Sequence, residues 1–388
     1  MIPYGIQDIN QQDIDAVVKV LQSDFLTQGP QVPLFEKTIN EVTQSQFAVA
    51  VNSATSALHI ACLALRVGKG DIVWTSPITF VASANCALYC GASIDFVDID
   101  KQTYNLCPVK LEKKLRHAKK KNKLPKVVIP VHLAGQSCDM QKIHQLSIEY
   151  GFKIIEDAAH AIGGQYQDKP IGNCQYSDIT VFSFHPVKIV TTGEGGVATT
   201  NNSRLANTMQ RLRSHGITRD ESLMTEPSHG DWYYQQLELG FNYRMSELHA
   251  ALGISQLTRL IEFVSKRKKL AETYAQQLSR LPILLPKQLI TTNSSWHLYI
   301  IQLELDKIEK PHQQVFKELR HRGIGVNLHY IPVHTQPYYK QLGFKNGMFK
   351  NAETYYKQAI SLPLFHSMDE QQLKTVINTL SQVLETKK

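Results

Sequence analysis

The sequence predicts an α/β protein in which a large domain contains a mainly parallel, seven-stranded sheet and a smaller C-terminal domain is α+β. Two observations lead to this prediction. Short, almost continuously apolar segments alternate with helical patterns up to about residue 255, and the pattern changes after Met245. Strands that are apolar throughout are typical of parallel sheets covered by helices on both faces. We expect an N-terminal arm over residues 1–24, a large domain over 25–255 and a small domain over 256–388.

The expected strands of the large domain are short and bounded by turn residues, at 48–52, 71–76, 93–97, 126–131, 153–156, 179–183 and 196–200. Helical patterns occur at 53–65, 80–89, 140–150 and 203–215. Residues 218–236 are polar and aromatic with little periodicity, which indicates a loop. In the small domain we expect one long helix over 246–281, strands at 297–303 and 325–329, and helices at 313–322, 352–359 and 369–384.

The composition indicates a soluble globular protein. Of 388 residues, 43% are apolar and 20% are charged, and no apolar run reaches membrane-spanning length. The N-terminus lacks a secretory signal pattern, and the six cysteines show no CxxC spacing, so we expect a cytoplasmic protein with no metal centre. Much of the +8 net charge comes from the basic run 110–126, which we interpret as a solvated helix face and loop rather than a nucleic-acid site.

The segment 178–196 contains a single lysine, Lys188, with apolar neighbours, directly after a strand that ends at Ser183. Burial disfavours the ammonium form and lowers the pKa of a lysine. A neutral amine is what Schiff-base chemistry requires. The alternative interpretation is a lysine whose stem packs against the protein while its ammonium group reaches water.

A carboxylate, Asp157, follows the strand expected at 153–156. A buried carboxylate requires a cation or hydrogen-bond donors, and the ring nitrogen of pyridoxal phosphate becomes a suitable cation beside an aspartate. The alternative is an ordinary N-cap of the next helix.

A turn rich in hydroxyl groups, Ser53-Ala54-Thr55-Ser56, begins the helix expected at 53–65. The first turn of a helix has unpaired N–H groups and a partial positive charge, so it can bind a phosphate. The turn lacks the glycines of a P-loop or of a dinucleotide fingerprint, which argues against an NAD-dependent oxidoreductase. These residues could also be plain helix caps.

The candidate residues share one position in the expected fold. Phe80, Asp157, Ser183 and Lys188 all follow predicted strands. Because ligands in parallel sheets bind beyond the carboxyl ends of the strands, we expect a single site there.

Several motifs together resemble the DegT/DnrJ/EryC1/StrS family of sugar aminotransferases, from residues 26–30 to the C-terminal region. They are NSATSALH, PITFVASAN, IEDAAHAIGGQY, FSFHPVKIVTTGEGG, RSHGI and GFNYRMSELHAALG. The resemblance implies pyridoxal 5′-phosphate as cofactor, the fold type I of enzymes that use it, and action on a nucleotide-linked keto sugar. It further implies transfer of an amino group from L-glutamate to C4 of a UDP-linked 4-keto-6-deoxy sugar, for pseudaminic acid in a bacterial surface sugar.

The resemblance also implies roles for the cofactor-side residues. Lys188 would form the Schiff base and act as general base, Asp157 would keep the ring nitrogen protonated, and Phe80 would stack on the ring. The phosphate would be held by Ser53, Ala54, Thr55 and Ser183. His160, the third candidate catalytic residue, would lie near the ring hydroxyl and the substrate.

On the substrate side the resemblance implies a homodimer with shared active sites. Asn242 would reach the neighbouring subunit's phosphate, and Arg244 an anionic group of the substrate. His185, Tyr4, His329 and Tyr330 are further candidates for the sugar nucleotide. We expect neither nucleic acid nor membrane as a partner.

Two other functions use the same cofactor site. A nucleotide-sugar dehydratase of this family can carry histidine at the lysine position, so Lys188 favours transamination. A non-catalytic cofactor-binding regulatory protein would not need the intact lysine, aspartate and phosphate motifs.

Overall fold

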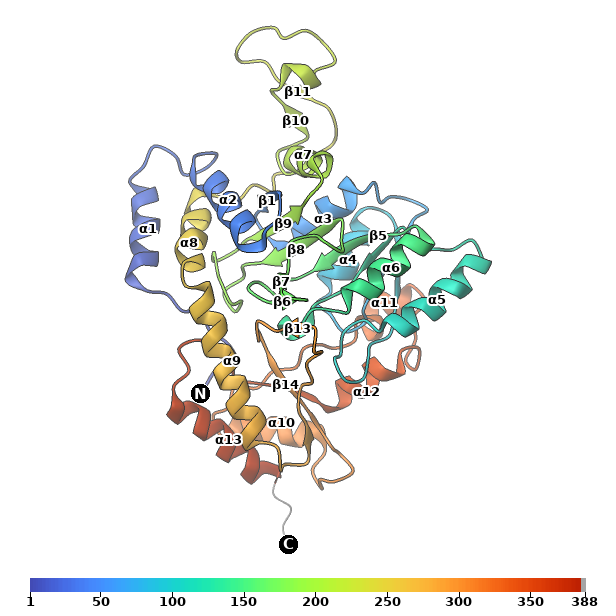
Figure 1. Cartoon of the computed structure of the whole chain (residues 1–388), viewed down its shortest axis with the longest axis vertical. Helices are drawn as coiled ribbons and strands as arrows, with labels where there is room; N and C mark the ends of the chain where they lie inside the picture. The colour runs from blue at the N-terminus through green and yellow to red at the C-terminus, as the bar shows by residue number, and fades with distance from the viewer. Residues whose placement is uncertain (385–388) are drawn as a thin grey trace.

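The computed structural model describes residues 1–384, which form a central seven-stranded sheet with helices on both faces (Figure 1). The strand order is β1-β9-β8-β5-β4-β2-β3, and β9 alone runs antiparallel to its neighbours in this sheet. The strands are β1 (Phe47–Val51), β2 (Ile72–Thr75), β3 (Ser93–Phe96), β4 (Val127–Ile129), β5 (Lys153–Asp157), β8 (Ile179–Ser183) and β9 (Gly196–Thr200). The predicted α/β class and seven-stranded, mainly parallel sheet are confirmed.

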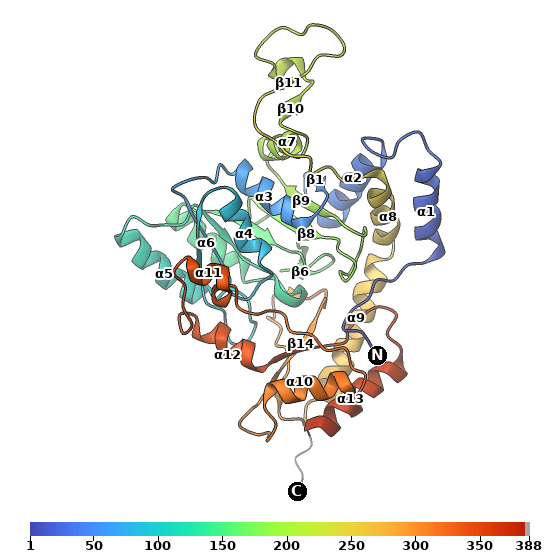
Figure 2. The same cartoon turned by 180° about the vertical axis from the view of Figure 1, so that it is seen from behind.

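Two groups of helices cover the sheet. One face carries α3 (Ala54–Ala64), α4 (Ala82–Tyr89) and α7 (Ser203–Leu212), which are in front in Figure 2. The other face carries α2 (Gln31–Thr43), α5 (Pro108–Lys120), α6 (Met140–Tyr150) and α8 (Glu247–Leu257). Each strand therefore buries both of its faces, which explains the continuous apolar runs in the sequence.

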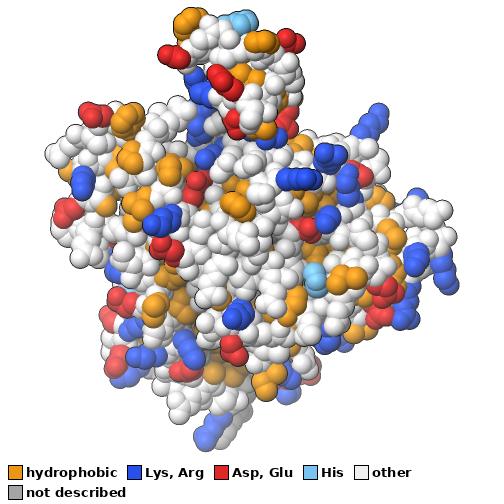
Figure 3. All heavy atoms as spheres, turned by 45° about the horizontal axis from the view of Figure 1, so that its top comes forward, with side chains coloured by type: hydrophobic (Ala, Val, Ile, Leu, Met, Phe, Trp, Pro, Cys, Tyr) orange, Lys and Arg blue, Asp and Glu red, His pale blue; other side chains and the backbone are white. Residues whose placement is uncertain are grey.

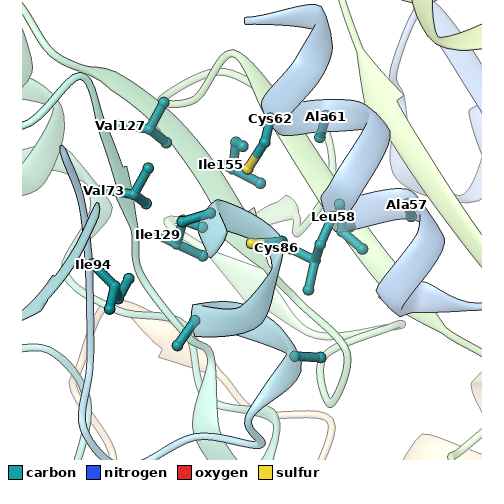
Figure 4. Close-up of a cluster of buried hydrophobic side chains, with 14 of the residues drawn as sticks. Ala57, Leu58, Ala61, Cys62, Val73, Cys86, Ile94, Val127, Ile129 and Ile155 are labelled. Carbon is teal, nitrogen blue, oxygen red and sulfur yellow. The ribbon is translucent and has the colours of Figure 1, made fainter. Parts of the chain in front are cut away.

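The core beneath α3 and α4 shows how the sheet fixes these helices. Ala57, Leu58, Ala61 and Cys62 of α3 lie beside Cys86 of α4 and above the sheet (Figure 4). The strand side chains that meet them are Val73, Val127, Ile129 and Ile155, and all are completely buried. Removing apolar area from water stabilises a fold by about 25 cal/mol per Å². This packing therefore holds the N-termini of both helices at the edge of the sheet.

The N-terminal segment is attached to the body at two places. Helix α1 (Gln11–Leu21) lies beside α8 (Figure 1), and its buried Asp13 accepts hydrogen bonds from Ser255 Oγ (2.6 Å) and from an Arg259 guanidinium nitrogen (2.7 Å). Nearer the terminus, the Ile2 N–H donates to the Gly323 carbonyl and the Ile2 carbonyl accepts from the Gly325 N–H, both at 2.7 Å. The elements predicted from the sequence do not include α1 or α2.

A second, smaller sheet is made of β12 (Ile283–Leu284), β14 (Tyr299–Leu303) and β15 (Ala359–Leu362). It packs with α9 (Leu260–Gln277), α10 (His312–His321) and α13 (Glu370–Leu384) around a separate apolar cluster. The domain limit at 255/256 stays a prediction, and residues 385–388 of the expected small domain lie outside the described residues.

Two predictions about the small domain are wrong. The strand expected at 325–329 is an extended segment with only isolated bridges, from Ile324 to Ile2 and from Asn327 to Ser361, and the third strand is β15 instead. Each of these bridges joins a single pair of residues, so the segment 325–329 forms no continuous hydrogen-bonded ladder with either neighbour. The helix expected over 246–281 is divided into α8 and α9 at Thr258 and Arg259, where the chain turns.

The remaining elements are short. They are η1 (Leu133–Gly135), β6 (Gln165–Tyr166), β7 (Lys169–Pro170), β10 (Ile217–Thr218), η2 (Glu221–Leu223), β11 (Gln235–Gln236), β13 (Thr292–Asn293), η3 (Val333–Thr335), α11 (Pro337–Gln341) and α12 (Lys350–Gln358). The loop expected at 218–236 is mostly irregular, but β10 and β11 pair at its base and make it an arm that projects from the body (Figures 1 and 2). Figure 3 shows acidic, basic and hydrophobic side chains interspersed on the face that includes this arm.

The basic run 110–126 is only partly the solvated surface that the sequence suggests. Lys110 and Lys114 of α5 form salt bridges with Asp98 and Asp95, each at 2.6 Å. The Lys114 ammonium also lies 4.8 Å from the centre of the Trp74 ring, and burial lowers its pKa. Among residues 1–384, no helix is both long enough and apolar enough to cross a bilayer.

The buried contacts of Asp13 give a testable prediction. We expect Asp13→Ala to lower the local stability of α1 by about 3 kcal/mol, because it leaves buried donors of α8 and Arg259 without their acceptor. Hydrogen exchange of residues 11–21 should therefore become faster by roughly 10²-fold. The matched control is Asp15→Ala, an exposed acid on the same helix. Equal protection in both variants would contradict the assigned role of Asp13.

Candidate active site

A cleft of about 560 Å³ opens at the carboxyl ends of the parallel strands. Residues that follow β1, β2, β5 and β8 line one side, and the segment 327–330 and the N-terminal Tyr4 line another. The cleft brings together most of the candidates named from the sequence. These are Tyr4, Ser53, Ala54, Thr55, Phe80, Asp157, His160, Ser183, His185, Lys188, His329 and Tyr330.

One rim of the cleft is the N-terminus of α3. Ser53 is the N-cap, and its Oγ accepts a hydrogen bond from the Ser56 N–H at 3.1 Å. The N–H groups of Ala54 and Thr55 belong to the first turn, where intrahelical partners are lacking and the helix dipole is positive. Ser183, at the end of β8, adds a hydroxyl to the same cleft. This arrangement suits a phosphate.

Gly196 allows the first turn of α3 to lie directly against β9. A Cβ atom at this position would lie 2.4 Å from the Ala54 nitrogen and from the Ser53 carbonyl carbon. Any other residue would push the turn away from the sheet, because neither backbone group can yield. Gly196 thus fixes the height of the helix terminus above the cleft floor.

Asp157, the last residue of β5, is buried at the floor of the cleft. Its Oδ2 accepts a hydrogen bond from Ser83 Oγ at 2.6 Å, and its Oδ1 accepts from the Ala159 N–H at 3.1 Å. The Thr79 and Ser83 hydroxyls lie 2.6 Å apart, which orients Ser83. In the described part of the chain these neutral donors, and no salt bridge, hold the carboxylate. A cationic ring nitrogen in the cleft would supply the missing charge.

Lys188 follows β8, which runs parallel to β5 beside it, and lines the same cleft as Asp157. Burial lowers its pKa to about 8, and the negative charge of Asp157 opposes part of that shift. The side chain is half-buried, because the cleft itself admits solvent to it. The lysine is therefore neutral in about a tenth of the molecules at pH 7, far more than an ordinary lysine, and in that form it can act as a nucleophile or base.

A group of histidines and tyrosines forms the other wall. His160 Nδ1 accepts a hydrogen bond from the Ala134 N–H at 3.2 Å, and its Nε2 lies 3.0 Å from Tyr330 Oη. The His297 ring centre lies 4.4 Å from that of His160. Burial and the nearby Lys188 hold the pKa of His160 well below its ordinary value, and burial lowers the pKa of His329 to about 3. These imidazoles are therefore neutral at physiological pH.

Phe80 is an aromatic side chain held at the cleft with 59% of its surface exposed. Its ring centre lies 6.2 Å from that of Tyr330. A large apolar ring left open in a cleft is suited to stacking on a planar ligand. Tyr4 lies on the far side, 5.3 Å from the His329 ring, and the exposed His185 lies on the Lys188 loop.

Asn242 and Arg244 do not line this cleft. They flank Tyr243, whose carbonyl accepts a hydrogen bond from the Asn52 N–H at 2.8 Å, so both residues lie close to the start of α3. Asn242 is exposed, and Arg244 has a buried Nε without a hydrogen-bond partner among the described residues.

Sequence reasoning missed four residues that shape the site: Thr79, Ser83, His297 and Asn327. The hydroxyls of Thr79 and Ser83 flank Phe80 at helical spacing, which is a weak signal because serines and threonines commonly cap helices. Nothing in the local sequence of His297 or Asn327 distinguishes them from packing residues.

These features fit the parts of pyridoxal 5′-phosphate in turn. The first turn of α3 suits the phosphate, Asp157 suits the ring nitrogen, Phe80 suits the ring face, and the Lys188 amine suits the aldehyde. Fold and site together define the protein as a pyridoxal-phosphate-dependent enzyme.

The model of the DegT/DnrJ/EryC1/StrS aminotransferase family matches residues 7–381. The chain belongs to this family of sugar aminotransferases, of which a solved structure contains pyridoxal phosphate. It is 38% identical over 387 residues to the Bacillus subtilis spore coat polysaccharide biosynthesis protein SpsC, covering 99% of this chain and 97% of that one. It is 37% identical over 386 residues to the Campylobacter jejuni UDP-4-amino-4,6-dideoxy-N-acetyl-β-L-altrosamine transaminase, covering 99% and 98%.

Among solved structures, Helicobacter pylori PseC, an aminotransferase of pseudaminic acid biosynthesis, matches with a TM-score of 0.89 at 30% identity. The match covers 99% of both chains. The two proteins therefore share their fold over almost the whole of both chains.

The lowered pKa of Lys188 gives a second prediction. Because the amine loses its proton above about pH 8, its acylation by a limiting amine-reactive reagent in cofactor-free protein should be half-maximal near pH 8. Exposed lysines should require a higher pH, near their ordinary pKa of about 10.4. Peptide mapping by mass spectrometry measures the labelling of each lysine separately.

The control uses the cofactor. After addition of pyridoxal phosphate and reduction with borohydride, the covalently attached cofactor, which serves as the label, should lie on Lys188 in the wild type. This label should be absent in Lys188→Ala, whose circular dichroism should be unchanged. Lys153→Ala, which removes a lysine on the strand β5 remote from the cleft, should retain the label. A label on a different lysine would overturn the assignment.

Proposed function

We propose that the protein transfers the amino group of L-glutamate to C4 of a UDP-linked 4-keto-6-deoxy sugar, of the UDP-4-keto-6-deoxy-N-acetyl-L-altrosamine type, in the cytoplasm, for pseudaminic acid biosynthesis. The likeness to the Campylobacter transaminase and to PseC supports this substrate. The similar identity to SpsC supports the broader class, an amino sugar for a surface polysaccharide.

The observation that carries the proposal is Lys188, an amine of lowered pKa that lines the same cleft as a buried carboxylate. When bound, pyridoxal phosphate carries the amino group and accepts the electron pair left at the reacting carbon. The Nζ atom of Lys188, neutral above about pH 8, can remove the proton from Cα of glutamate and deliver a proton to C4 of the sugar. We therefore assign it as the catalytic base.

The other residues bind and orient. Asp157 holds a proton at the ring nitrogen, and Ser83 and the Ala159 N–H fix its direction. The amides of Ala54 and Thr55 bind the phosphate, together with the Ser53 and Ser183 hydroxyls. Phe80 stacks on the ring.

Four aromatic or imidazole side chains of the cleft are our candidates for binding the sugar nucleotide. Tyr4, His185, His329 and Tyr330 line the cleft, and we assign them to the sugar nucleotide. Neutral imidazoles and phenols bind the hydroxyls of a sugar by hydrogen bonds without adding charge to the cleft.

We also propose a homodimer whose active sites are shared. Asn242 and Arg244 lie outside their own cleft, although they flank the start of the phosphate-binding helix. A guanidinium with a buried, unpartnered Nε requires an acceptor, and a partner subunit or its anionic substrate supplies one. In this arrangement Asn242 contacts the neighbour's phosphate and Arg244 the substrate anion.

Lys188 also favours this function over that of a dehydratase. A transaminase needs the lysine to return a proton to C4, whereas a dehydratase of this family can lack it. A regulatory protein without turnover would have no use for an amine with a lowered pKa.

The third prediction concerns the product. Purified protein with L-glutamate and a panel of UDP- and dTDP-linked 4-keto sugars should release 2-oxoglutarate and yield a 4-amino sugar that keeps its ring hydroxyls, as identified by NMR. The UDP-linked 4-keto-6-deoxy-N-acetyl-L-altrosamine compound should give the highest kcat/KM. Loss of a ring hydroxyl would establish a dehydratase, and 2-oxoglutarate release without sugar amination would exclude the proposed acceptor.

The fourth prediction tests the shared site with hybrid dimers. Lys188→Ala and Arg244→Ala are each expected to be inactive. In a hybrid dimer, one site has both defects and the other has none, so random mixing should restore about a quarter of wild-type activity. If each site were made by a single chain, mixing would restore nothing. A mixture of Lys188→Ala with Asp157→Ala, both in one cleft, is the matched negative control.

A further inference from the structure

His160 has hydrogen-bond partners on both ring nitrogens, and one of them fixes the position of its proton. The Ala134 N–H points at Nδ1 at 3.2 Å. A backbone N–H can only donate, so Nδ1 must present a lone pair. The contact is enforced by the backbone, since Gly135, at φ +98°, lets the loop approach so closely that a Cβ there would lie 3.0 Å from the His160 carbonyl oxygen.

The remaining nitrogen must therefore carry the hydrogen. His160 is buried and neutral, because burial and the charge of Lys188 keep its pKa well below the ordinary value. A neutral imidazole has one N–H group, and with Nδ1 occupied by a donor this group is Nε2–H. In the 3.0 Å contact between Nε2 and Tyr330 Oη, the imidazole donates and the phenol oxygen accepts.

This direction leaves the hydrogen of the Tyr330 hydroxyl without a partner in the protein. Burial raises the pKa of Tyr330, so the phenol keeps its proton. Across the described residues, the His160 contact is the one side-chain hydrogen bond of this oxygen. Since Tyr330 lines the cleft and is only partly exposed, its O–H group is available to donate to a ligand there.

Neighbouring rings hold the phenol in place. The Tyr330 ring is nearly parallel to His160, with an interplanar angle of 23° and centroids 6.0 Å apart, and Phe80 lies on another side at 6.2 Å. A donor fixed before the ligand arrives loses little entropy on binding.

We propose that the Tyr330 O–H donates a hydrogen bond to the oxygen on C4 of the sugar, and that His160 is a positioning residue that imposes this direction. This inference rests on the proposed function for the identity of the acceptor. When an amine adds to a ketone, negative charge develops on the carbonyl oxygen, and a preorganised donor stabilises that charge. His160, predicted from the sequence as a catalytic residue, then acts through Tyr330.

Binding measurements test the donor without turnover. Titration calorimetry of the cofactor-loaded protein compares two UDP-linked 6-deoxy sugars that differ only in the presence of a hydroxyl at C4. Tyr330→Phe should weaken binding of the 4-hydroxy compound by about tenfold and leave binding of the 4-deoxy compound unchanged. The matched control is Tyr299→Phe, which removes a buried hydroxyl without a partner in the second apolar cluster and should alter neither affinity.

Substitution of His160 tests the positioning role. His160→Gln can place an amide N–H near the Nε2 position and should retain the difference in affinity between the 4-hydroxy and the 4-deoxy sugar. His160→Glu places an acceptor there, which takes the Tyr330 hydrogen, and should abolish the difference. Pyridoxal phosphate affinity and the melting temperature of each variant show that the cleft is intact.

In single-turnover kinetics, amination of the keto sugar should fall by about 10²-fold in Tyr330→Phe, far more than deamination of glutamate.

Two results would overturn the inference. One is equal loss of affinity for both sugars in Tyr330→Phe. The other is a tenfold loss of pyridoxal phosphate affinity in Tyr330→Phe, with the same affinity for the 4-hydroxy and the 4-deoxy sugar. In that case the cofactor, and not the sugar, would accept the hydrogen bond of Tyr330. A failure of the proposed function looks different, because the wild type would then release 2-oxoglutarate and aminate no keto sugar.

Discussion

Asp157 is a carboxylate at the end of a buried strand, held by a hydroxyl and a backbone amide, with no salt bridge among the described residues. Burial of an unpaired charge is costly, so the site favours a ligand that brings a positive ring nitrogen. The same charge acts on Lys188, where it opposes the effect of burial and leaves a pKa of about 8. The selection of the cofactor and the reactivity of the amine thus depend on one negative charge.

The topology of the sheet brings these groups together. Parallel strands end at one edge, so residues after β2, β5 and β8 meet there although they are far apart in the sequence. Strand β9 runs the other way and enters the sheet below the same edge. Its first residue, Gly196, meets the first turn of α3, which places the first amide groups of that helix directly above the reversed strand.

The sequence was sufficient for the sheet, and for placing Asp157 and Lys188 at one edge of it, because both depend on local patterns. Buried strands are continuously apolar, and Asp157 and Lys188 stand at their ends. The hydroxyl of Ser83 could not be assigned, because its contact with Asp157 joins residues far apart in the chain and depends on how α4 packs. The same limit hid β15, which was not predicted, and the break between α8 and α9, where Arg259 binds Asp8 and Asp13 of the N-terminal segment. Partners of this kind are set by tertiary packing, which local periodicity does not record.

The position of Ile2 affects the order in which the protein can be completed. Its backbone hydrogen-bonds to Gly323 and Gly325, and the carbonyl of the cleft residue Tyr4 accepts from the Leu364 N–H at 3.0 Å. Residues 2–4 thus bind partners that lie far along the chain, between residues 323 and 364. During translation the large sheet can form before these partners are made, because its strands all lie before residue 201. The wall of the cleft that carries Tyr4 therefore takes shape later in synthesis than the sheet that carries Asp157.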